Sequence, residues 1–277
     1  MMYTVGEIEA VLESFAPAAW AKDVFPEDNA GFLLGRREAP VSRVLVALDA
    51  DRRSVEEAVA REVQLLVTHH PVTFGTRRIT GETEEGARLL TLAEHKIAAL
   101  CMHTNWDAAP GGVSEVLARA VGLVPPYEIL GARFVHTDGR AYGLGRVGRL
   151  PAPCPPDRLA EQVRVLLRCP GVRFTAGGRP SHLVAVGSGA SGGQFDDVLR
   201  HGCDTFITGD VKHSLFLTAR ACGVTLIDAG HFHTEHPIVA SVAARLRRAL
   251  PDLTVLESEA VREPAVWRTE NREDRGE

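Results

Sequence analysis

The sequence lacks the long apolar runs and basic runs that mark membrane proteins and general nucleic-acid binders. No apolar run approaches the ~20 residues needed to cross a bilayer. No basic run occurs, and the net charge of -5 gives no electrostatic reason to expect binding to nucleic acid or to an anionic membrane. These absences favour a compact soluble protein.

The cysteines are few and unpaired in spacing. There are five, and none forms a Cys-x-x-Cys motif. An odd number without such pairs argues against a disulfide framework and against a cysteine zinc site. The first residues also lack the basic and uninterrupted apolar stretches of a secretory signal. We therefore expect a reducing, cytoplasmic setting.

Apolar runs that alternate with helical patterns dominate the rest of the chain. Strands are predicted at 44–49, 65–70, 97–102, 183–187, 204–208 and 224–228. Helices are predicted at 5–15, 54–62, 84–95, 113–121, 157–168 and 212–222. Fully apolar strands separated by helices indicate parallel sheets covered on both faces, so the predicted class is α/β.

The length of 277 residues fits one large domain or two ordinary ones. We predict one α/β domain from residues 1–126 and 223–277, with a second α/β domain, residues 127–222, inserted in it. Both sheets are expected to be mostly parallel. The charged tail after Trp267 is predicted to be disordered.

Histidine and acidic residues gather directly after three of the predicted strands. They are His69, His70, His103, Asp107, His231, His233, Glu235 and His236. Parallel sheets collect their ligand sites at the carboxyl ends of strands, so we expect these side chains to converge. Mixed imidazole and carboxylate ligands suit zinc, iron(II), manganese(II) or nickel. Three such clusters together favour a metal site over three unrelated roles.

Each cluster taken alone has a plainer interpretation. An isolated His69-His70 pair is more often one packed and one surface histidine, and a lone Asp107 is more often a turn or N-cap residue. Within a two-metal site, however, Asp107 would be a candidate bridging ligand. Cys101 lies inside a predicted strand and is expected to pack rather than to bind metal.

The third cluster contains a helix breaker. Pro237 forbids a helix running through it, so we expect a helix that begins near Thr234. His231 is then predicted in the preceding loop and Glu235 in the first helical turn. A carboxylate in that turn is favoured by the helix dipole.

Three glycine-containing segments also border strands. The loop 187–193 is either a phosphate-binding loop or a tight turn, since it has neither a Walker ending nor dinucleotide spacing. The segment 209–213 is either a source of substrate or supporting contacts or a solvated helix start. The segment 28–35 is predicted to be a turn feeding a short strand, with no chemistry assigned from its spacing.

Ordered motifs along nearly the whole chain resemble those of the Nif3-like family, also called the dinuclear metal centre family or GTP cyclohydrolase 1 type 2 homologues. The motifs are Asp28-Asn29-Ala30-Gly31, Leu66 to Pro71, His103-Thr104-Asn105-Trp106-Asp107 with Gly111-Gly112-Val113, Gly187 to Gly193, Thr208-Gly209-Asp210 with His213, and Asp228-Ala229-Gly230-His231 with Glu235. Two positions depart from the family pattern: Ala30 stands where valine is usual, and His213 where a histidine pair is common.

The resemblance implies a two-domain α/β subunit with a dinuclear site at the strand carboxyl ends. It implies that two divalent ions per subunit, zinc, iron or manganese, are held by His69, His70, Asp107, His231 and Glu235. It also implies a homo-oligomer, usually a toroidal hexamer.

Two functions follow from the resemblance. One is metal-dependent hydrolysis of a nucleotide or other small molecule, as in GTP cyclohydrolase 1 type 2 activity. His103 and His233 would then be catalytic proton shuttles. The other is a non-enzymatic metal-binding or regulatory protein, which needs no such shuttle.

Overall fold

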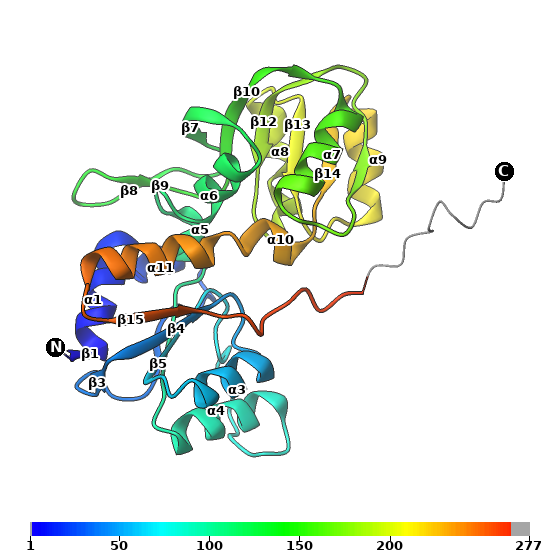
Figure 1. The fold of residues 1–277 in the computed structure, drawn as a ribbon. Helices are drawn as coiled ribbons and strands as arrows, with labels where there is room; N and C mark the ends of the chain where they lie inside the picture. Colours follow the sequence, from blue (N-terminus) through cyan, green and yellow to red (C-terminus); the bar gives the residue numbers. More distant parts are fainter. Residues whose placement is uncertain (1, 267–277) are drawn as a thin grey trace.

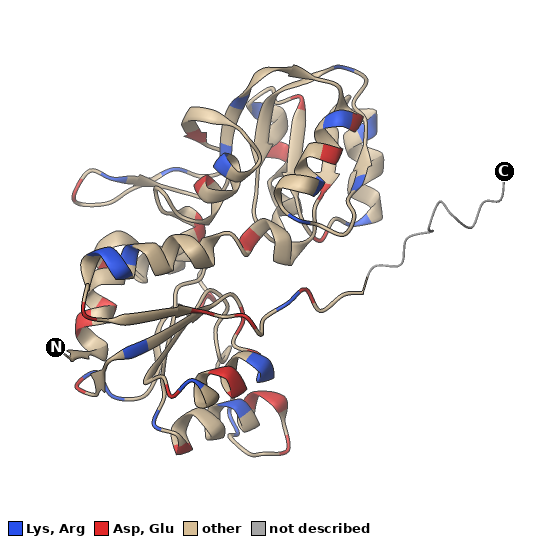
Figure 2. Cartoon of the chain, viewed as in Figure 1, with Lys and Arg blue, Asp and Glu red and all other residues tan. Residues whose placement is uncertain are grey.

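The computed structural model describes residues 2–266 and has two halves, each built on one sheet (Figure 1). The predicted α/β class is confirmed. Within residues 2–266 no helix is long and apolar enough to cross a membrane. The tail after Trp267, for which disorder was predicted, lies outside the described residues. Figure 2 shows basic and acidic residues interspersed along both halves.

The first half contains a five-stranded sheet that is parallel except at one edge. Its order is β15 (Thr254–Glu257), β4 (Arg43–Ala47), β5 (Leu65–Thr68), β6 (Ala98–Cys101) and β2 (Gly31–Leu34). Only β2 runs antiparallel. Every residue of β5 and β6 is buried, as expected for strands covered on both faces.

Helices cover both faces of this sheet. On one side lie α1 (Val5–Phe15) and α11 (Ile238–Ala249), and on the other lie α3 (Arg52–Ala60) and α4 (Glu84–Glu94) (Figure 1). The first predicted helix has the expected bounds. Thr4 caps it by accepting a hydrogen bond from the Glu7 N–H, and its buried stripe includes Ile8 and Leu12.

The second half contains a six-stranded mixed sheet. Its order is β11 (Arg173–Thr175), β14 (Thr225–Asp228), β13 (Thr205–Thr208), β12 (Ser181–Val186), β10 (Arg146–Cys154) and β7 (Val124–Ile129). Only the β12–β13 and β13–β14 pairs are parallel. The expectation of a mostly parallel sheet is therefore wrong for this half, because β7, β10 and β11 all pair antiparallel.

Side chains that alternate along β12 face two helical layers. Val184 and Val186 pack in one core with α6 (Val113–Ala120) and α7 (Pro156–Leu166). Ala185 points to the opposite core, with α8 (Phe195–Arg200) and α9 (His213–Ala221). This period of two is what places helices on both faces of the sheet.

The sheets divide the chain differently from the predicted segments. The strand β14 was assigned with residues 223–277 to the first domain, but it pairs in parallel with β13 of the six-stranded sheet. Consecutive strand–helix–strand units commonly lie side by side in one sheet, which accounts for this placement. The helix α6 also packs on the six-stranded sheet, although it precedes residue 127. The division into two domains at 126 and 222 stays a prediction.

A buried arginine ties β10 to the junction of the two halves. The Arg146 side chain is 1% exposed and donates five hydrogen bonds. Its acceptors are Glu115 Oε1 and the carbonyl oxygens of Gly143, Gly145, Ala108 and Ala109. Because a guanidinium has five donors, none is left unsatisfied.

Short elements complete the description. They are β1 (Tyr3–Thr4), β3 (Pro40–Val41), β8 (Phe134–Val135), β9 (Ala141–Tyr142), α2 (Ala19–Val24), α5 (Thr104–Ala108), α10 (His231–Glu235) and a 3₁₀ turn (Ser191–Gln194). Two of them matter for function, since α5 follows β6 and α10 follows β14. Both lie where the two halves meet (Figure 1).

Candidate metal centre

His69 and His70 directly follow the buried strand β5. Their backbone N–H groups donate to the Leu48 carbonyl at 3.2 and 2.9 Å, so β4 fixes the turn from which both imidazoles project. The His69 ring is only 1% exposed. Its Nε2 lies 3.8 Å from Asp107 Oδ2, and the His70 Nε2 lies 3.3 Å from the His231 Nε2. The five residues predicted as metal ligands therefore come together.

Two ligand groups share one carboxylate, that of Glu235. One group is His69, Asp107 and Glu235, and the other is His70, His231 and Glu235. Glu235 Oε2 lies 3.1 Å from the Nε2 atoms of both His70 and His231, and 3.9 Å from that of His69. Asp107 was considered as the bridging ligand, but it belongs to only one of these groups. Glu235 is the residue common to both groups.

Each imidazole of the centre is held by an acceptor at Nδ1. For His69 the acceptor is the Met102 carbonyl at 3.0 Å, for His70 it is Asp49 at 2.7 Å, and for His231 it is Asp210 at 2.7 Å. Such partners keep the Nδ1 proton in place and present the Nε2 lone pair, which is how histidines are oriented toward metals.

Buried polar atoms without partners support a cation in this position. While the histidines are neutral, with the proton on Nδ1, His69 Nε2 and Glu235 Oε2 are buried and have no hydrogen-bond partner among the described residues. Leaving such atoms unsatisfied costs about 1–3 kcal/mol each. Ligand atoms around a metal bound at about 2.0–2.2 Å stand roughly 3–4 Å apart, as the donor atoms do here. The residues present therefore fit divalent ions.

The electrostatics are those of imidazoles gathered around a carboxylate. Burial opposes a charge on His70, but its bonds to Asp49 and Glu235 raise its pKa to about 10. The hydrogen bond to Glu235 raises the pKa of His231 to about 9. Burial would raise the pKa of Glu235, yet the histidine hydrogen bonds lower it well below its ordinary value. In the metal-free protein, protonated histidines therefore pair with the Glu235 carboxylate.

The helix α10 corrects the predicted loop position of His231. The helix begins at His231, with Gly230 as its N-cap at φ +80, and not near Thr234. The helix α10 ends at Glu235, before Pro237, and Pro237 is the N-cap of the next helix, α11. A proline is tolerated at the start of a helix. His231 and Glu235, four residues apart, consequently share one face of α10.

His103, predicted to be catalytic, lies at the edge of the centre, where it forms a third group of potential ligands with His69 and His70. Its ring centroid is 5.3 Å from that of His69 and 5.6 Å from that of His70. Its Nδ1 bonds Asp28 at 2.7 Å, and Asp28 also accepts a hydrogen bond from Thr104. These hydrogen bonds outweigh burial and lower the pKa of Asp28.

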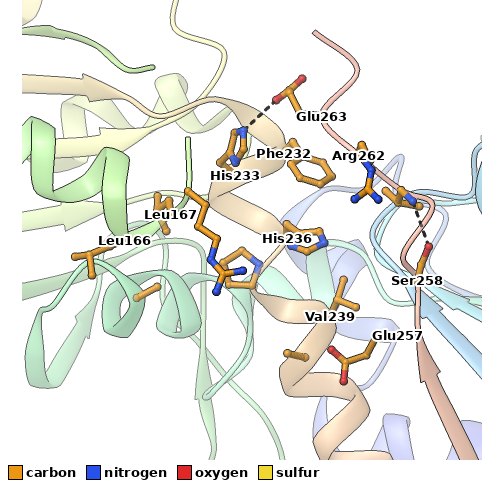
Figure 3. Close-up of a pocket in the computed structure, with 15 residues that line it drawn as sticks. Leu166, Leu167, Phe232, His233, His236, Val239, Glu257, Ser258, Arg262 and Glu263 are labelled. Carbon is orange, nitrogen blue, oxygen red and sulfur yellow. Dashed lines mark hydrogen bonds and ion pairs between the residues drawn. The ribbon is translucent and has the colours of Figure 1, made fainter. Parts of the chain in front are cut away.

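His233, the other predicted proton shuttle, is not brought to the centre. It belongs to none of the three potential ligand groups. On α10 it points into a separate cavity, where its Nε2 lies 3.9 Å from Glu263 Oε2 (Figure 3). Residues two apart on a helix lie on different faces, so His231 and His233 cannot serve the same site.

The glycine loop 187–193 approaches the metal ligands closely. The Ser188 hydroxyl donates to Asp107 at 2.9 Å, and the Gly189 N–H donates to Thr234 Oγ1 at 3.0 Å. Gly189 has φ +57, and a Cβ there would overlap the Glu235 carboxylate. Of the two interpretations offered for this loop, the tight turn describes Gly189, where any larger residue would collide.

The sequence predicted a role for only one of the three aspartates that accept hydrogen bonds from histidines of the site. Asp210 lies in a segment from which supporting contacts were expected, but Asp28 was given no chemistry and Asp49 was not singled out. Asp49 lies two residues beyond the end of β4. Its position after a parallel strand, level with His70 in the β4–β5 register, was the available signal. Cys101 packs as predicted, being 1% exposed with its thiol donating to the His69 carbonyl.

Comparisons with known proteins place the whole chain in one family. A profile of the Duf34/NIF3 family (NGG1p interacting factor 3) matches residues 3–264. A Streptomyces coelicolor protein named GTP cyclohydrolase 1 type 2 homolog is 36% identical over 252 residues, which is 88% of this chain and 86% of that protein. A Schizosaccharomyces pombe protein named Protein NIF3 homolog is 32% identical over 226 residues, or 78% and 80% of the two chains.

Solved structures show the same fold. The crystal structure of a Bacillus cereus protein related to NIF3 superposes with a TM-score of 0.88 at 20% identity, covering 96% of this chain and 99% of that one. The profile match, the relatives above 30% identity and the shared fold agree. The chain belongs to the Duf34/NIF3 family.

Proposed function

We propose that this protein is a dinuclear metal-dependent hydrolase. The observation that carries the proposal is the position of Glu235, whose carboxylate is shared by two groups of potential ligands. His69 and Asp107 would complete one ion's protein ligands, and His70 and His231 the other's. Imidazole and carboxylate donors without thiolate suit zinc, iron(II) or manganese(II).

Two adjacent divalent ions, when bound, lower the pKa of a shared water and polarise a substrate carbonyl, amidine or phosphoryl group. The chain supplies the orientation of its ligands through Asp49, Asp210 and the Met102 carbonyl. It also supplies a proton carrier, His103. Because its Nδ1 is engaged by Asp28, its Nε2 is the nitrogen that exchanges a proton with substrate. His233 is left out of this role since it faces the other side of α10.

The proposed substrate class is a nucleotide or a related small molecule, with GTP the first to test. This rests on the names of the relatives and on family resemblance. In that reaction water adds at C8 of the purine and formate leaves. Lys212, exposed at the N-cap of α9, is a candidate contact for the triphosphate.

Metal content and formate release test the proposal together. Purified wild-type protein is expected to hold about two ions per chain by elemental analysis and to release formate from GTP. Asp107→Ala is expected to lose one of the two ions and the turnover, while His95→Ala, which changes an exposed histidine outside the centre, keeps both ions and the turnover. Wild-type protein without bound metal after metal-replete expression would overturn the site. If the wild-type protein holds two ions but releases formate no faster than Asp107→Ala, the cyclohydrolase activity is overturned and the non-enzymatic role is favoured.

The assembly and setting are proposed on the family resemblance. We expect a homohexamer in a cytoplasmic setting. Light scattering coupled to size-exclusion chromatography should give a mass about six times that of the chain. A monomeric mass would refute the hexamer without affecting the metal proposal.

A further inference from the structure

A second cavity lies on the side of α10 opposite the metal centre. Its volume is ≈ 730 Å³, within the range of roughly 300–1,000 Å³ typical of small-molecule sites. The walls come from the end of α7, from α10 and α11, and from the segment that follows β15 (Figure 3). The metal ligands His231 and Glu235 do not line it, whereas His233 and His236 do.

The cavity contains a buried polar atom without a partner. His233 is 9% exposed, and its Nε2 makes no hydrogen bond with any residue from 2 to 266. The nearest carboxylate oxygen, Glu263 Oε2, is 3.9 Å away, which is too far for a hydrogen bond. Buried polar atoms normally have partners, so a polar group entering between His233 and Glu263 would satisfy this one.

The charges at the rim of the cavity favour an anion. Arg168 and Arg262 line it, are exposed, and form no ion pair with any described residue. Of the two acidic residues in the lining, Glu257 is already paired with Arg247 at 2.7 Å. Glu263 therefore stands alone against two guanidinium groups, which are the preferred partners of carboxylate and phosphate.

The remaining wall is apolar. Leu167, Val239 and Val261 are buried residues whose side chains line the cavity. Phe232 stacks on His236, with ring centroids 4.7 Å apart, and adds an aromatic surface. An apolar wall with a few convergent polar groups is the usual composition of a site for an organic ligand.

We propose that this cavity binds a small organic anion with an apolar, ring-containing body. Its anionic group lies at the rim with Arg168 and Arg262, its body lies against Leu167, Val239 and Val261, and a neutral hydrogen-bonding group reaches His233. The site is independent of the hydrolysis proposed above. It differs from the metal centre in residues and in the face of α10 that it uses.

Two fluorescent probes test separately whether the cavity binds an apolar body and whether it prefers an anion. 1-Anilinonaphthalene-8-sulfonate has an apolar body and an anionic group, and N-phenyl-1-naphthylamine is its uncharged counterpart. Titration of the full-length, metal-loaded protein is expected to show one saturable sulfonate-probe site per chain. Arg262→Glu should weaken the sulfonate probe about tenfold or more, since a charge-assisted bond is lost, and should change the neutral probe less than twofold.

Two further variants keep the test decisive. Ala240→Trp places a large side chain at an exposed position of the lining and should abolish binding of both probes. Arg179→Glu, an exposed arginine outside the cavity, is the matched control and should change neither. All three variants should keep the wild-type metal content and thermal transition.

Four results would overturn the proposal. They are the absence of saturable sulfonate-probe binding, wild-type binding of both probes by Ala240→Trp, equal weakening of the sulfonate probe by Arg262→Glu and Arg179→Glu, and equal weakening of both probes by Arg262→Glu. The last result would show an apolar cavity without preference for an anion.

Discussion

The Nε2 atoms of His70 and His231 face each other at 3.3 Å, although 161 residues separate the two histidines in the chain. Each ring has its Nδ1 bonded to an aspartate, so each would point a lone pair at the other in its neutral form. Such an arrangement requires a positive charge between or beside the rings. A proton meets the requirement in the metal-free protein, and a divalent ion meets it in the proposed loaded state.

The shared carboxylate predicts unequal losses of metal. His231→Ala removes a ligand from one group and should leave about one ion per chain, whereas Glu235→Gln touches both groups and should leave none. Elemental analysis after gel filtration gives the count, with His95→Ala retaining the wild-type value. If Glu235→Gln and His231→Ala lose the same single ion, Glu235 is not the bridging residue.

The aspartate behind His70 should tune metal affinity. Asp49→Ala removes the acceptor at 2.7 Å from His70 Nδ1, and loss of such a partner typically weakens metal binding by about 10–100-fold. Competition with a chromogenic chelator measures the change. Asp196→Ala, at an exposed position of α8, is the control for loss of one negative charge. Equal affinities in the two variants would contradict a role for Asp49.

Substitution by alanine should be more damaging at Gly189 than at Gly202, another glycine with a positive φ. Alanine at Gly189 (φ +57) or at Gly202 (φ +66) carries about 1–2 kcal/mol of backbone strain. Only at Gly189 would the new Cβ also overlap the Glu235 carboxylate, since nothing lies within 4 Å of a Cβ at Gly202. Gly189→Ala should therefore lose metal while Gly202→Ala keeps it. Chemical denaturation and metal analysis of both variants test this, and metal retained by Gly189→Ala would count against it.

Metal should stabilise the protein increasingly as the pH rises, while the metal-free protein loses stability. The folded pKa values of His70 and His231 are about 10 and about 9, above the ordinary 6.5. Their contribution to metal-free stability is therefore fully present below about pH 6.5 and is lost as pH rises through 9 to 10. Metal binding displaces the same protons, so its stabilising effect should grow over this window.

Calorimetry at pH 6.5 and pH 9 with and without metal checks this prediction. The metal-free melting temperature should fall with pH, and the increase on adding metal should become larger. The His70→Gln variant should show a smaller fall. A metal-free melting temperature that rises across the window would refute the assignment of these protons.

Arg146 should be required for stability. Removing its side chain deletes five hydrogen bonds in a buried region, and breaking a buried ion pair costs roughly 3–5 kcal/mol. Arg149→Ala on the same strand alters an exposed arginine and should cost less than about 0.5 kcal/mol. Urea denaturation compares the two, and similar losses would show that the Arg146 network contributes little.

The sequence was most informative where apolar strands end in polar residues. The runs before His69 and before His103 predicted β5 and β6 because a strand buried on both faces must be apolar throughout. The mixed pairing of the six-stranded sheet was not predicted, since the prolines and glycines between 127 and 180 weaken the periodic signal. Strand direction is set by which edge a segment joins, and no local pattern encodes that.

The geometry of the centre was harder to predict than the identity of the residues that form it. Pro237 was taken to exclude a helix through the cluster, which put His231 in a loop, but a separate short helix, α10, begins at His231 and ends before that proline. Asp49 was overlooked because a single aspartate after a strand has the same pattern as a turn residue. That Glu235 is shared by two ligand groups depends on the meeting of two sheets, which only the three-dimensional structure contains.

The distribution of the ligands along the chain determines when the centre can form during biosynthesis. His69, His70 and Asp107 leave the ribosome before the segment that carries His231 and Glu235, and at ~5–20 residues per second the interval between His70 and His231 is roughly 8–30 seconds. A nascent chain consequently offers only an incomplete set of donors. Full-affinity metal binding at the proposed centre would therefore follow the docking of the segment that carries His231 and Glu235, and the ions available at that stage would decide which ones the protein acquires.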